Sequence, residues 1–281
     1  SCCTAAVLGG RWWPLHATRG VNDAEVQPSA APALGPLDRK ALLAEHAGSI
    51  AGLRRSTGSK LSDQDLLAHL RAATLNGESP ASRVRATDAW RLTSGLEAKL
   101  GNKAWQKAEL ELRQVLKCDN LGLDKFGRPM LVQRVGAWDV GAVEAAAEDV
   151  ERFTMLNAMI CEKLIQTSRP SSAKDPRGVV VIMDMEGLGL SHLSTKMLYA
   201  FSSVAKAIRS FYPDMLAYIF VVRAPWVFTA VKTALRPLLT AKSLSHLQIT
   251  PDVPKELRGL GEGRLPEELG GTRSHVFPFD E

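Results

Sequence analysis

The chain has 281 residues, of which 45% are hydrophobic, so it can bury the core of one large domain or two smaller ones. Its 35 lysines and arginines exceed its 30 aspartates and glutamates, but both signs are interspersed and only 6% of residues are aromatic, which argues against a nucleic-acid-binding protein. The four cysteines form no CxxC pair, so the sequence predicts neither a metal site nor a disulfide framework and favours a reducing compartment.

No apolar stretch approaches the roughly 18 residues of a membrane span. The apolar patch from Thr4 to Leu8 is also too short for the core of a signal peptide. Adjacent Cys2 and Cys3 could carry lipid chains, although two ordinary thiols are the simpler interpretation. We therefore expect a cytoplasmic protein, with N-terminal targeting left open.

The first 110 residues divide into two parts. Residues 1–36 mix Ala, Gly and Pro without sustained periodicity, and we interpret them as a flexible tail or linker. Residues 37–110 predict a small helical subdomain, in which Ser62 and Asp65 have the spacing of a capping box and Ser79-Pro80 begins another helix. The last residues, 276–281, are interpreted as a tail.

Residues 111–275 predict an α/β domain. A strand pair is expected from residues 115–118 and 130–135 around a turn at 119–128, followed by a helix over 143–166. The apolar runs 179–183 and 216–222 predict buried strands, and the helical pattern of 195–210 between them predicts a crossover in a mostly parallel sheet. Residues 247–250 predict one more short strand.

The second buried strand runs directly into an amphipathic helix, from about Pro225 to Leu239. Its apolar face includes Trp226, Val227, Ala230 and Val231, and its other face carries Lys232 and Arg236. Because Lys232 and Arg236 are four residues apart, both cations lie on one side, where they suit an anionic membrane surface.

Enzyme signatures are weak. Gly187-Leu-Gly189 follows a strand, where a dinucleotide fold binds pyrophosphate, but His192 stands at the third glycine position. Asp184 and Glu186 in the same turn would repel phosphate. We expect Asp184 to cap the loop after its strand by accepting backbone N–H bonds, and we expect no catalytic residue, no metal and no cofactor.

Several motifs occur in the order seen in one protein family. They are Asp124-x-x-Gly127-Arg-Pro-Met130, Gly136-x-Trp138-Asp139, the run Val179 to Ser191, Tyr212-Pro213-Asp214-Met215, Ala224-Pro-Trp-x-Phe228, Arg236-Pro-Leu-Leu239 and Leu265-Pro-x-Glu-Leu-Gly-Gly-Thr272. Over about residues 105–275 the chain resembles CRAL-TRIO lipid-binding domains of the yeast secretory phosphatidylinositol transfer type. The preceding helices resemble the N-terminal extension of that family.

The resemblance implies a mixed, mostly parallel sheet that forms the floor of an apolar lipid pocket, with the helix after Ala-Pro-Trp as a gate that opens on membranes. The expected lipid-binding residues are Val179, Val181, Met183, Tyr218, Phe220, Trp226, Val227, Ala230 and Val231. Residues expected at the membrane or headgroup are Arg223, Lys232 and Arg236, and those with structural roles are Asp184, Gly187 and Pro213.

The headgroup positions differ from those of the best-known members. Val179 and Val181 stand where phosphatidylcholine-binding members carry Ser and Thr, and Ser203 stands where phosphatidylinositol binders carry an acidic residue. The resemblance thus implies a monomer that binds one lipid and transfers it at membranes, and the changed headgroup positions favour a lipid less polar than an inositol lipid. A membrane-docking regulatory or scaffolding module remains the alternative, and a nucleotide-dependent α/β enzyme the third hypothesis.

Overall fold

The computed structural model describes residues 39–167, 178–225, 247–261 and 263–274. The two expected tails and the expected gate helix after Pro225 lie outside these ranges. Within them, no helix is both long enough and apolar enough to cross a bilayer.

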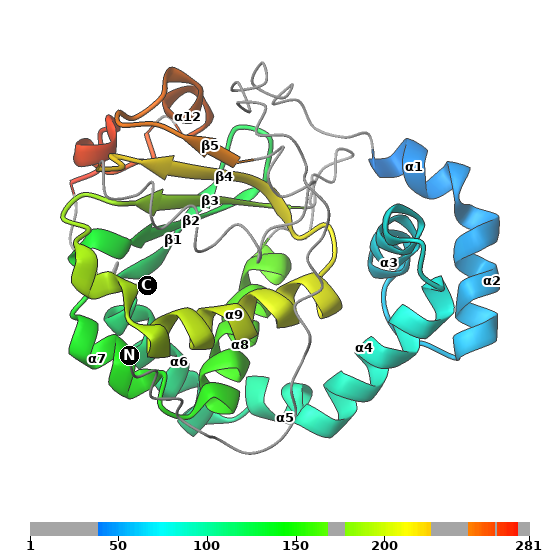
Figure 1. Ribbon diagram of the computed structural model, residues 1–281. Coiled ribbons are helices and arrows are strands. Elements are labelled where there is room, and N and C mark those ends of the chain that lie inside the picture. The colour runs from blue at the N-terminus through cyan, green and yellow to red at the C-terminus, as the bar shows by residue number, and fades with distance from the viewer. Residues whose placement is uncertain (1–38, 168–177, 226–246, 262, 275–281) are drawn as a thin grey trace, which may run out of the picture.

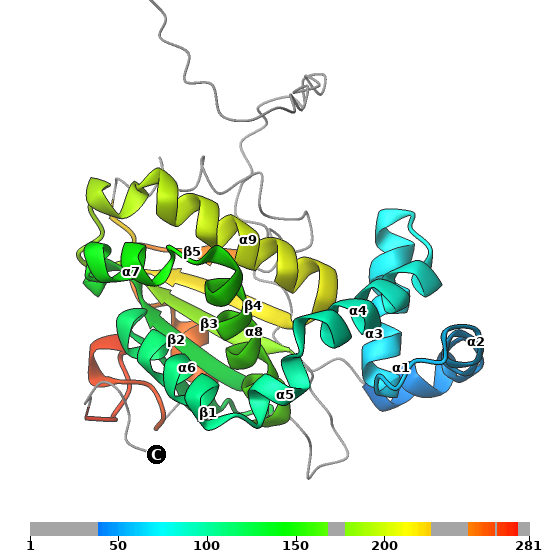
Figure 2. The same cartoon turned by 90° about the horizontal axis from the view of Figure 1, so that it is seen from below.

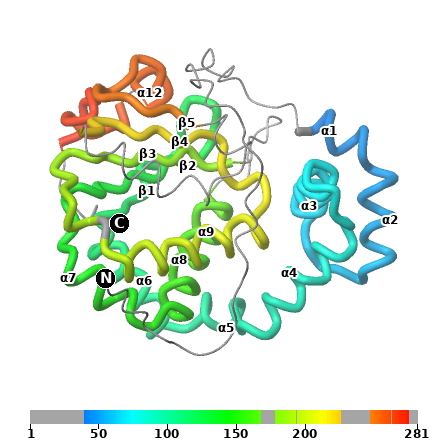
Figure 3. The backbone as a smooth tube through the Cα atoms, in the orientation of Figure 1, coloured from blue at the N-terminus to red at the C-terminus, as the bar shows by residue number. Residues whose placement is uncertain are grey.

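In the described residues from Arg39 onward, six helices precede the first strand. They are α1 (Arg39–Glu45), α2 (Ala47–Thr57), α3 (Asp63–Asn76), α4 (Pro80–Ser94), α5 (Leu96–Leu100) and α6 (Lys103–Val115). Figure 3 shows α1 to α4 beside the sheet rather than on it. They share a small core of their own, built around Leu66, Leu67 and Val84. The capping box of Ser62 and Asp65 is confirmed at the start of α3, and Ser79 caps α4.

Among the described residues, the sheet has five strands in the order β1-β2-β3-β4-β5. The strands are β1 (Cys118–Leu123), β2 (Pro129–Arg134), β3 (Val179–Asp184), β4 (Leu216–Val222) and β5 (Leu247–Ile249). β1 and β2 pair antiparallel, and all other pairs are parallel. The expected mixed, mostly parallel sheet is therefore confirmed.

The first strand was expected too early in the chain. Residues up to Val115 belong to α6, and β1 begins at Cys118 and includes residues assigned from the sequence to a turn. The polar Asp119 obscured this strand: its carboxylate is buried, where it accepts a hydrogen bond from Arg113 at 2.8 Å. The expected domain boundary at residue 110 falls within α6, which packs on α8 and β1.

The long helix expected over 143–166 is two helices, α7 (Val140–Ala146) and α8 (Val150–Thr167). The carboxylate of Asp149 accepts a hydrogen bond from the backbone N–H of Arg152 at 2.9 Å, which begins the new helix. The helix between β3 and β4 is α9 (Thr195–Phe211), one residue longer than expected. The remaining described elements are the short helices η1 (Val135–Ala137), η2 (Leu190–Leu193), α12 (Lys255–Leu260) and η4 (Glu267–Leu269).

The sheet lies between two unequal layers. Helices α8 and α9 lie on one side, below the sheet in Figure 1, and α12 with η4 lies on the other. Figure 2, seen from below, shows α6 to α9 in front of the strands. The alternation of side chains along each strand therefore divides the apolar residues between two different environments.

Candidate functional site

The two faces of β3 differ in burial. On the α12 side, Val180 and Ile182 are both 0% exposed and pack with Leu257 and Leu260. On the α8 and α9 side, Val181 and Met183 of β3 are only half-buried. Neighbouring strands add more half-buried apolar side chains to the clusters on this side, namely Leu216, Leu247 and Ile249. This incompletely covered apolar face is the candidate site.

Aromatic side chains from α8, from α9 and from the residue that follows η1 adjoin this side of the sheet. Phe201 of α9 is half-buried and stacks on Trp138 with ring centroids 5.2 Å apart. It also meets the edge of Phe153 of α8 at 5.4 Å. The indole N–H of Trp138 donates to the backbone carbonyl of Leu116 at 2.6 Å, which fixes the ring. The sequence analysis did not place these residues at the lipid site, although Trp138 belongs to one of the family motifs.

Tyr218 and Phe220 were expected to contact the lipid, but they lie on the opposite face of the sheet from Val181 and Met183. Both belong to the cluster with Leu257. The Arg128 guanidinium lies 5.1 Å from the Tyr218 ring and is itself paired with the buried carboxylate of Asp124 at 2.7 Å. The β4 residues on the same side as Met183 are instead Ile219 and Val221, so the structure does not bring Tyr218 and Phe220 together with Val181 and Met183.

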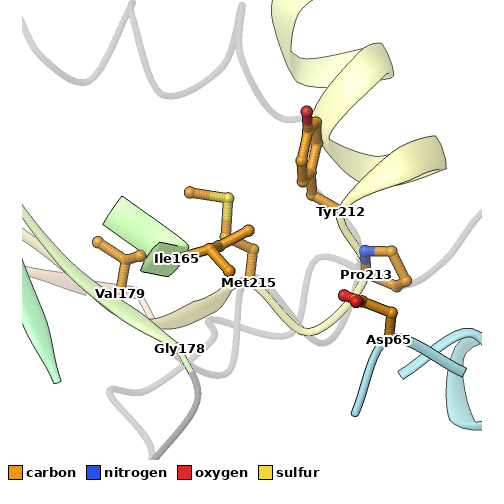
Figure 4. A pocket seen from close by; sticks show the side chains of 7 residues that line it. All are labelled: Asp65, Ile165, Gly178, Val179, Tyr212, Pro213 and Met215. Carbon is orange, nitrogen blue, oxygen red and sulfur yellow. The ribbon is translucent and has the colours of Figure 1, made fainter. Parts of the chain in front are cut away.

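Val179 lies on the same side as Val181 but deeper, at 1% exposure. Figure 4 shows it beside a small cavity also lined by Ile165 of α8, Met215 and the Tyr212-Pro213 segment, with Asp65 of α3 on the far side. The cavity holds about 10 Å³, close to the minimum for one water molecule, so it cannot hold a lipid chain. Val179 therefore contributes to the core here.

Asp184 ends β3 and, as expected, caps the following loop. Its Oδ1 accepts the backbone N–H of Glu186 at 3.1 Å. The same carboxylate accepts two hydrogen bonds from Arg223, one of them from Nε at 2.9 Å, and the other guanidinium nitrogen of Arg223 pairs with Glu186. Burial alone would lower the pKa of Arg223, but the hydrogen bonds to Asp184 outweigh it and raise that pKa.

This arrangement bears on the role expected for Arg223 at a headgroup or membrane. Its side chain is only 18% exposed, and its guanidinium already forms ion pairs with the carboxylates of Asp184 and Glu186. It also adopts a left-handed backbone conformation with φ of 53°, which is uncommon for a residue other than glycine. The positive charge of Arg223 is thus compensated within the protein.

The Gly187-Leu-Gly189 turn does not form a phosphate-binding loop. The amide of Leu188 donates to the Met185 carbonyl at 2.9 Å, and that of Gly189 donates to His192 Nδ1 at 3.1 Å, so these donors are used internally. Gly187 has φ of 87° and lies against Gly136, where an added Cβ would come within 3.0 Å of that carbonyl oxygen. Its expected structural role thus has a physical cause: close approach of the loop to η1.

Pro213 follows α9 within a segment that joins the helical subdomain to the sheet. The Tyr212 hydroxyl donates to Glu162 of α8 at 2.9 Å, and Arg91 of α4 donates to the same oxygen at 2.5 Å. Burial raises the pKa of Tyr212, and the nearby Glu162 charge adds to the effect. Trp90 stacks on Phe211 at 4.3 Å.

Two further arginines of the helical subdomain reach the end of α9. Arg71 lies 3.4 Å from the Asp214 carboxylate, and Arg83 donates to the backbone carbonyls of Arg209 and Ser210. These carbonyls belong to the last turn of α9, where they lack helical partners, so the arginine satisfies otherwise open acceptors. The helical subdomain therefore holds the C-terminal end of α9.

Six expected site residues lie outside the described ranges: Trp226, Val227, Ala230, Val231, Lys232 and Arg236. Within those ranges there is no cluster of three or more metal-ligating side chains. Cys118 and Cys161 are free and buried, and burial raises the pKa of Cys118 to about 12, so its thiol is unreactive at neutral pH.

The fold and site define a class: α/β proteins with a mostly parallel sheet, one apolar face of which is incompletely covered by helices, preceded by a helical subdomain. The chain belongs to the CRAL-TRIO family, because the family model described as CRAL/TRIO domain matches residues 114–271. The expected family is confirmed.

Curated relatives agree with this assignment. A CRAL-TRIO domain-containing protein of Caenorhabditis elegans is 26% identical over 223 residues, which cover 76% of this chain and 30% of the relative. The phosphatidylinositol/phosphatidylcholine transfer protein SFH11 of Arabidopsis thaliana is 30% identical over 156 residues, or 53% of this chain and 41% of that protein. The chain thus spans less than half the length of these relatives.

A solved structure supports the fold as well. The crystal structure of Sfh5 superposes with a TM-score of 0.61 at 15% sequence identity, covering 85% of this chain and 88% of that one. At this level of identity the similarity concerns the fold alone. It extends beyond residues 114–271, so part of the helical subdomain also has a counterpart there.

Proposed function

We propose that the protein binds a single hydrophobic lipid between the half-buried face of its sheet and the helices opposite, and transfers or presents this lipid at membranes. The observation that carries the proposal is the alternating burial along β3. Val180 and Ile182, which face α12, are completely buried, whereas Val181 and Met183, which face the other side, are only half-buried. A parallel sheet is normally covered on both faces, so the incompletely covered apolar face calls for an apolar occupant.

A lipid chain suits this face energetically. Each buried CH₂ group contributes about 0.8 kcal/mol, so a long acyl chain or prenoid needs no strong polar contact to remain bound. The partly buried Phe201 and Ile208 of α9 offer apolar surface of the same kind. The function requires no reaction, and we assign no catalytic residue.

The relatives support this ligand class. The names of several similar proteins, including SFH11, describe transfer of phosphatidylinositol and phosphatidylcholine. Because this chain matches only part of each, the transfer activity is a proposal here. The apolar Val181, together with uncharged Ser203, favours a lipid with a smaller polar head than inositol phosphate.

The test is direct. The purified protein is examined by native mass spectrometry, and its organic extract by lipid mass spectrometry. We expect one lipid per chain, released by denaturation, and exchange of that lipid between donor and acceptor liposomes. A protein that is folded but carries no stoichiometric lipid, and acquires none from liposomes, would instead fit a membrane-docking regulatory module.

A further inference from the structure

The outer side of α9 carries a line of polar and basic residues. Thr195, Tyr199, Ser202, Lys206 and Arg209 are spaced four, three, four and three residues apart, which places them on one face of a helix. We call them the α9 stripe. The opposite face contains Met197, Ala200 and Val204, all buried against the core. Figure 2 shows α9 along the outer edge of the helical layer.

The stripe is basic without compensation. Helix α9 contains no acidic residue, and within the described part of the chain neither Lys206 nor Arg209 forms an ion pair with a carboxylate. Lys196, which lies off the line, is the α9 cation that meets Glu148, at 3.4 Å. Arg209 is in the last turn, where the helix dipole favours a cation, but Lys206 is further back and is not explained in this way.

Apolar side chains are exposed at the other end of the stripe. Tyr199 is 66% exposed, and Leu190, in η2 directly before α9, is 71% exposed. Large apolar side chains with this exposure are few in the described residues, and η2 packs on α9, so these two lie in one region. A surface that joins exposed Leu and Tyr to unpaired cations has the composition of a helix lying at a membrane interface.

We propose that the α9 stripe, with Leu190, is a docking surface for an anionic lipid bilayer. Charge complementarity selects this occupant: an acidic leaflet neutralises Lys206 and Arg209, while Leu190 and Tyr199 enter the headgroup region. The inference rests on the proposed lipid-binding function and adds to it the surface that meets the membrane. Because α9 also faces the sheet, a bilayer on its outer side lies about one helix diameter, ~10 Å, from the apolar face.

The decisive experiment measures binding to vesicles. Vesicles of phosphatidylcholine with ~30 mol% phosphatidylserine are compared with pure phosphatidylcholine vesicles for the wild type and for Lys206→Gln with Arg209→Gln. Two cations near an anionic leaflet change binding by roughly thirtyfold in total. We expect the double variant to bind the acidic vesicles about thirtyfold more weakly and the neutral vesicles equally. Rising salt should weaken the wild type on acidic vesicles because it screens the same charges.

Matched controls separate this surface from net charge and from other basic sites. Lys103→Gln with Lys107→Gln removes the same charge from the exposed side of α6, and we expect less than a twofold change. Lys232→Gln with Arg236→Gln tests the helix expected after Pro225 in the same assay. Thermal unfolding and native mass spectrometry of bound lipid report whether each variant is folded and loaded.

The outcomes are distinguishable. The proposal is overturned if the α9 variant binds acidic vesicles as well as the wild type does. It is also overturned if the α9 variant loses as much binding to neutral vesicles as to acidic ones, or if only the Lys232 and Arg236 variant binds acidic vesicles more weakly. Such results leave the proposed lipid binding intact if lipid still copurifies. In a third case, no variant copurifies with lipid, the wild type binds acidic vesicles, and the α9 variant binds them more weakly. This result supports the docking surface but contradicts the proposal that the protein carries a lipid.

Discussion

Replacing Val181 by Asp tests the candidate lipid face most directly. Val181 is half-buried at the centre of β3, and its cross-strand neighbours, Leu131 of β2 and Ile219 of β4, are both apolar. In the empty protein a carboxylate at this position can remain hydrated. When an apolar lipid covers the face, the carboxylate loses its water and gains no partner from the adjacent strands, so the cost falls on lipid binding.

The size of the effect follows from the pKa of the new carboxyl group. An unpaired carboxyl in apolar surroundings has its pKa raised by about 3 units, from ~4 to ~7. Each unit corresponds to about 1.4 kcal/mol, so the penalty at pH 7 is about 4 kcal/mol, or roughly a thousandfold in affinity. Because the protonated acid is tolerated, the penalty is absent below about pH 4, grows as the pH rises, and is about tenfold at pH 5.

The assay is lipid occupancy by native mass spectrometry after equilibration with vesicles containing the copurified lipid, at pH 5 and pH 7. Val181→Asn is the matched control, because its unpaired amide costs about 1–3 kcal/mol at either pH. Ile182→Asp is the contrasting variant: its site is 0% exposed against α12, so we expect unfolding instead of lipid loss. A folded Val181→Asp protein with wild-type occupancy at pH 7 would show that no lipid touches this face.

Three further predictions follow from other residues. Phosphatidylinositol should be transferred between liposomes more slowly than a sterol, and selective, efficient phosphatidylinositol transfer would refute the headgroup argument. Tyr212→Phe loses the hydrogen bond to Glu162 and should cost about 2 kcal/mol in chemical unfolding at pH 7. Burial raises the pKa of Tyr212, so the contribution of its hydroxyl to stability is complete below pH ~10 and is lost as the pH rises further. The Tyr212→Phe variant should therefore lose less stability at alkaline pH than the wild type does, and Tyr199→Phe, which removes an exposed hydroxyl, is the control for the substitution itself. Gly136→Ala places a Cβ 2.0 Å from a backbone carbonyl oxygen of the β3–η2 loop, so it should lower the free energy of unfolding by about 3 kcal/mol. Gly189→Ala is the control, because its Cβ has room; equal thermal midpoints for the two variants would contradict this packing.

Local signals predicted most of the elements. The apolar run of β4 has the same bounds in sequence and structure, and the capping box at Ser62 and the helix start at Ser79 depend on residues three apart. Two errors also had local causes. The polar residues of β1 concealed a strand that long-range pairing with β2 stabilises, and the apolar pattern of α7 continues into α8 across a break that Asp149 determines.

The sequence by itself determined the two central strands, the helix between them and the family, because periodicity, caps and motif spacing act over a few residues. Only the tertiary structure decided which alternate residues share a face: Tyr218 and Phe220 point toward α12, while Val181 and Met183 point toward the helices on the other side. It also decided that Arg223 is paired with Asp184, 39 residues away along the chain. Such choices depend on how distant segments pack against the two faces of one sheet, and strand periodicity of two residues specifies alternation without specifying which side is which.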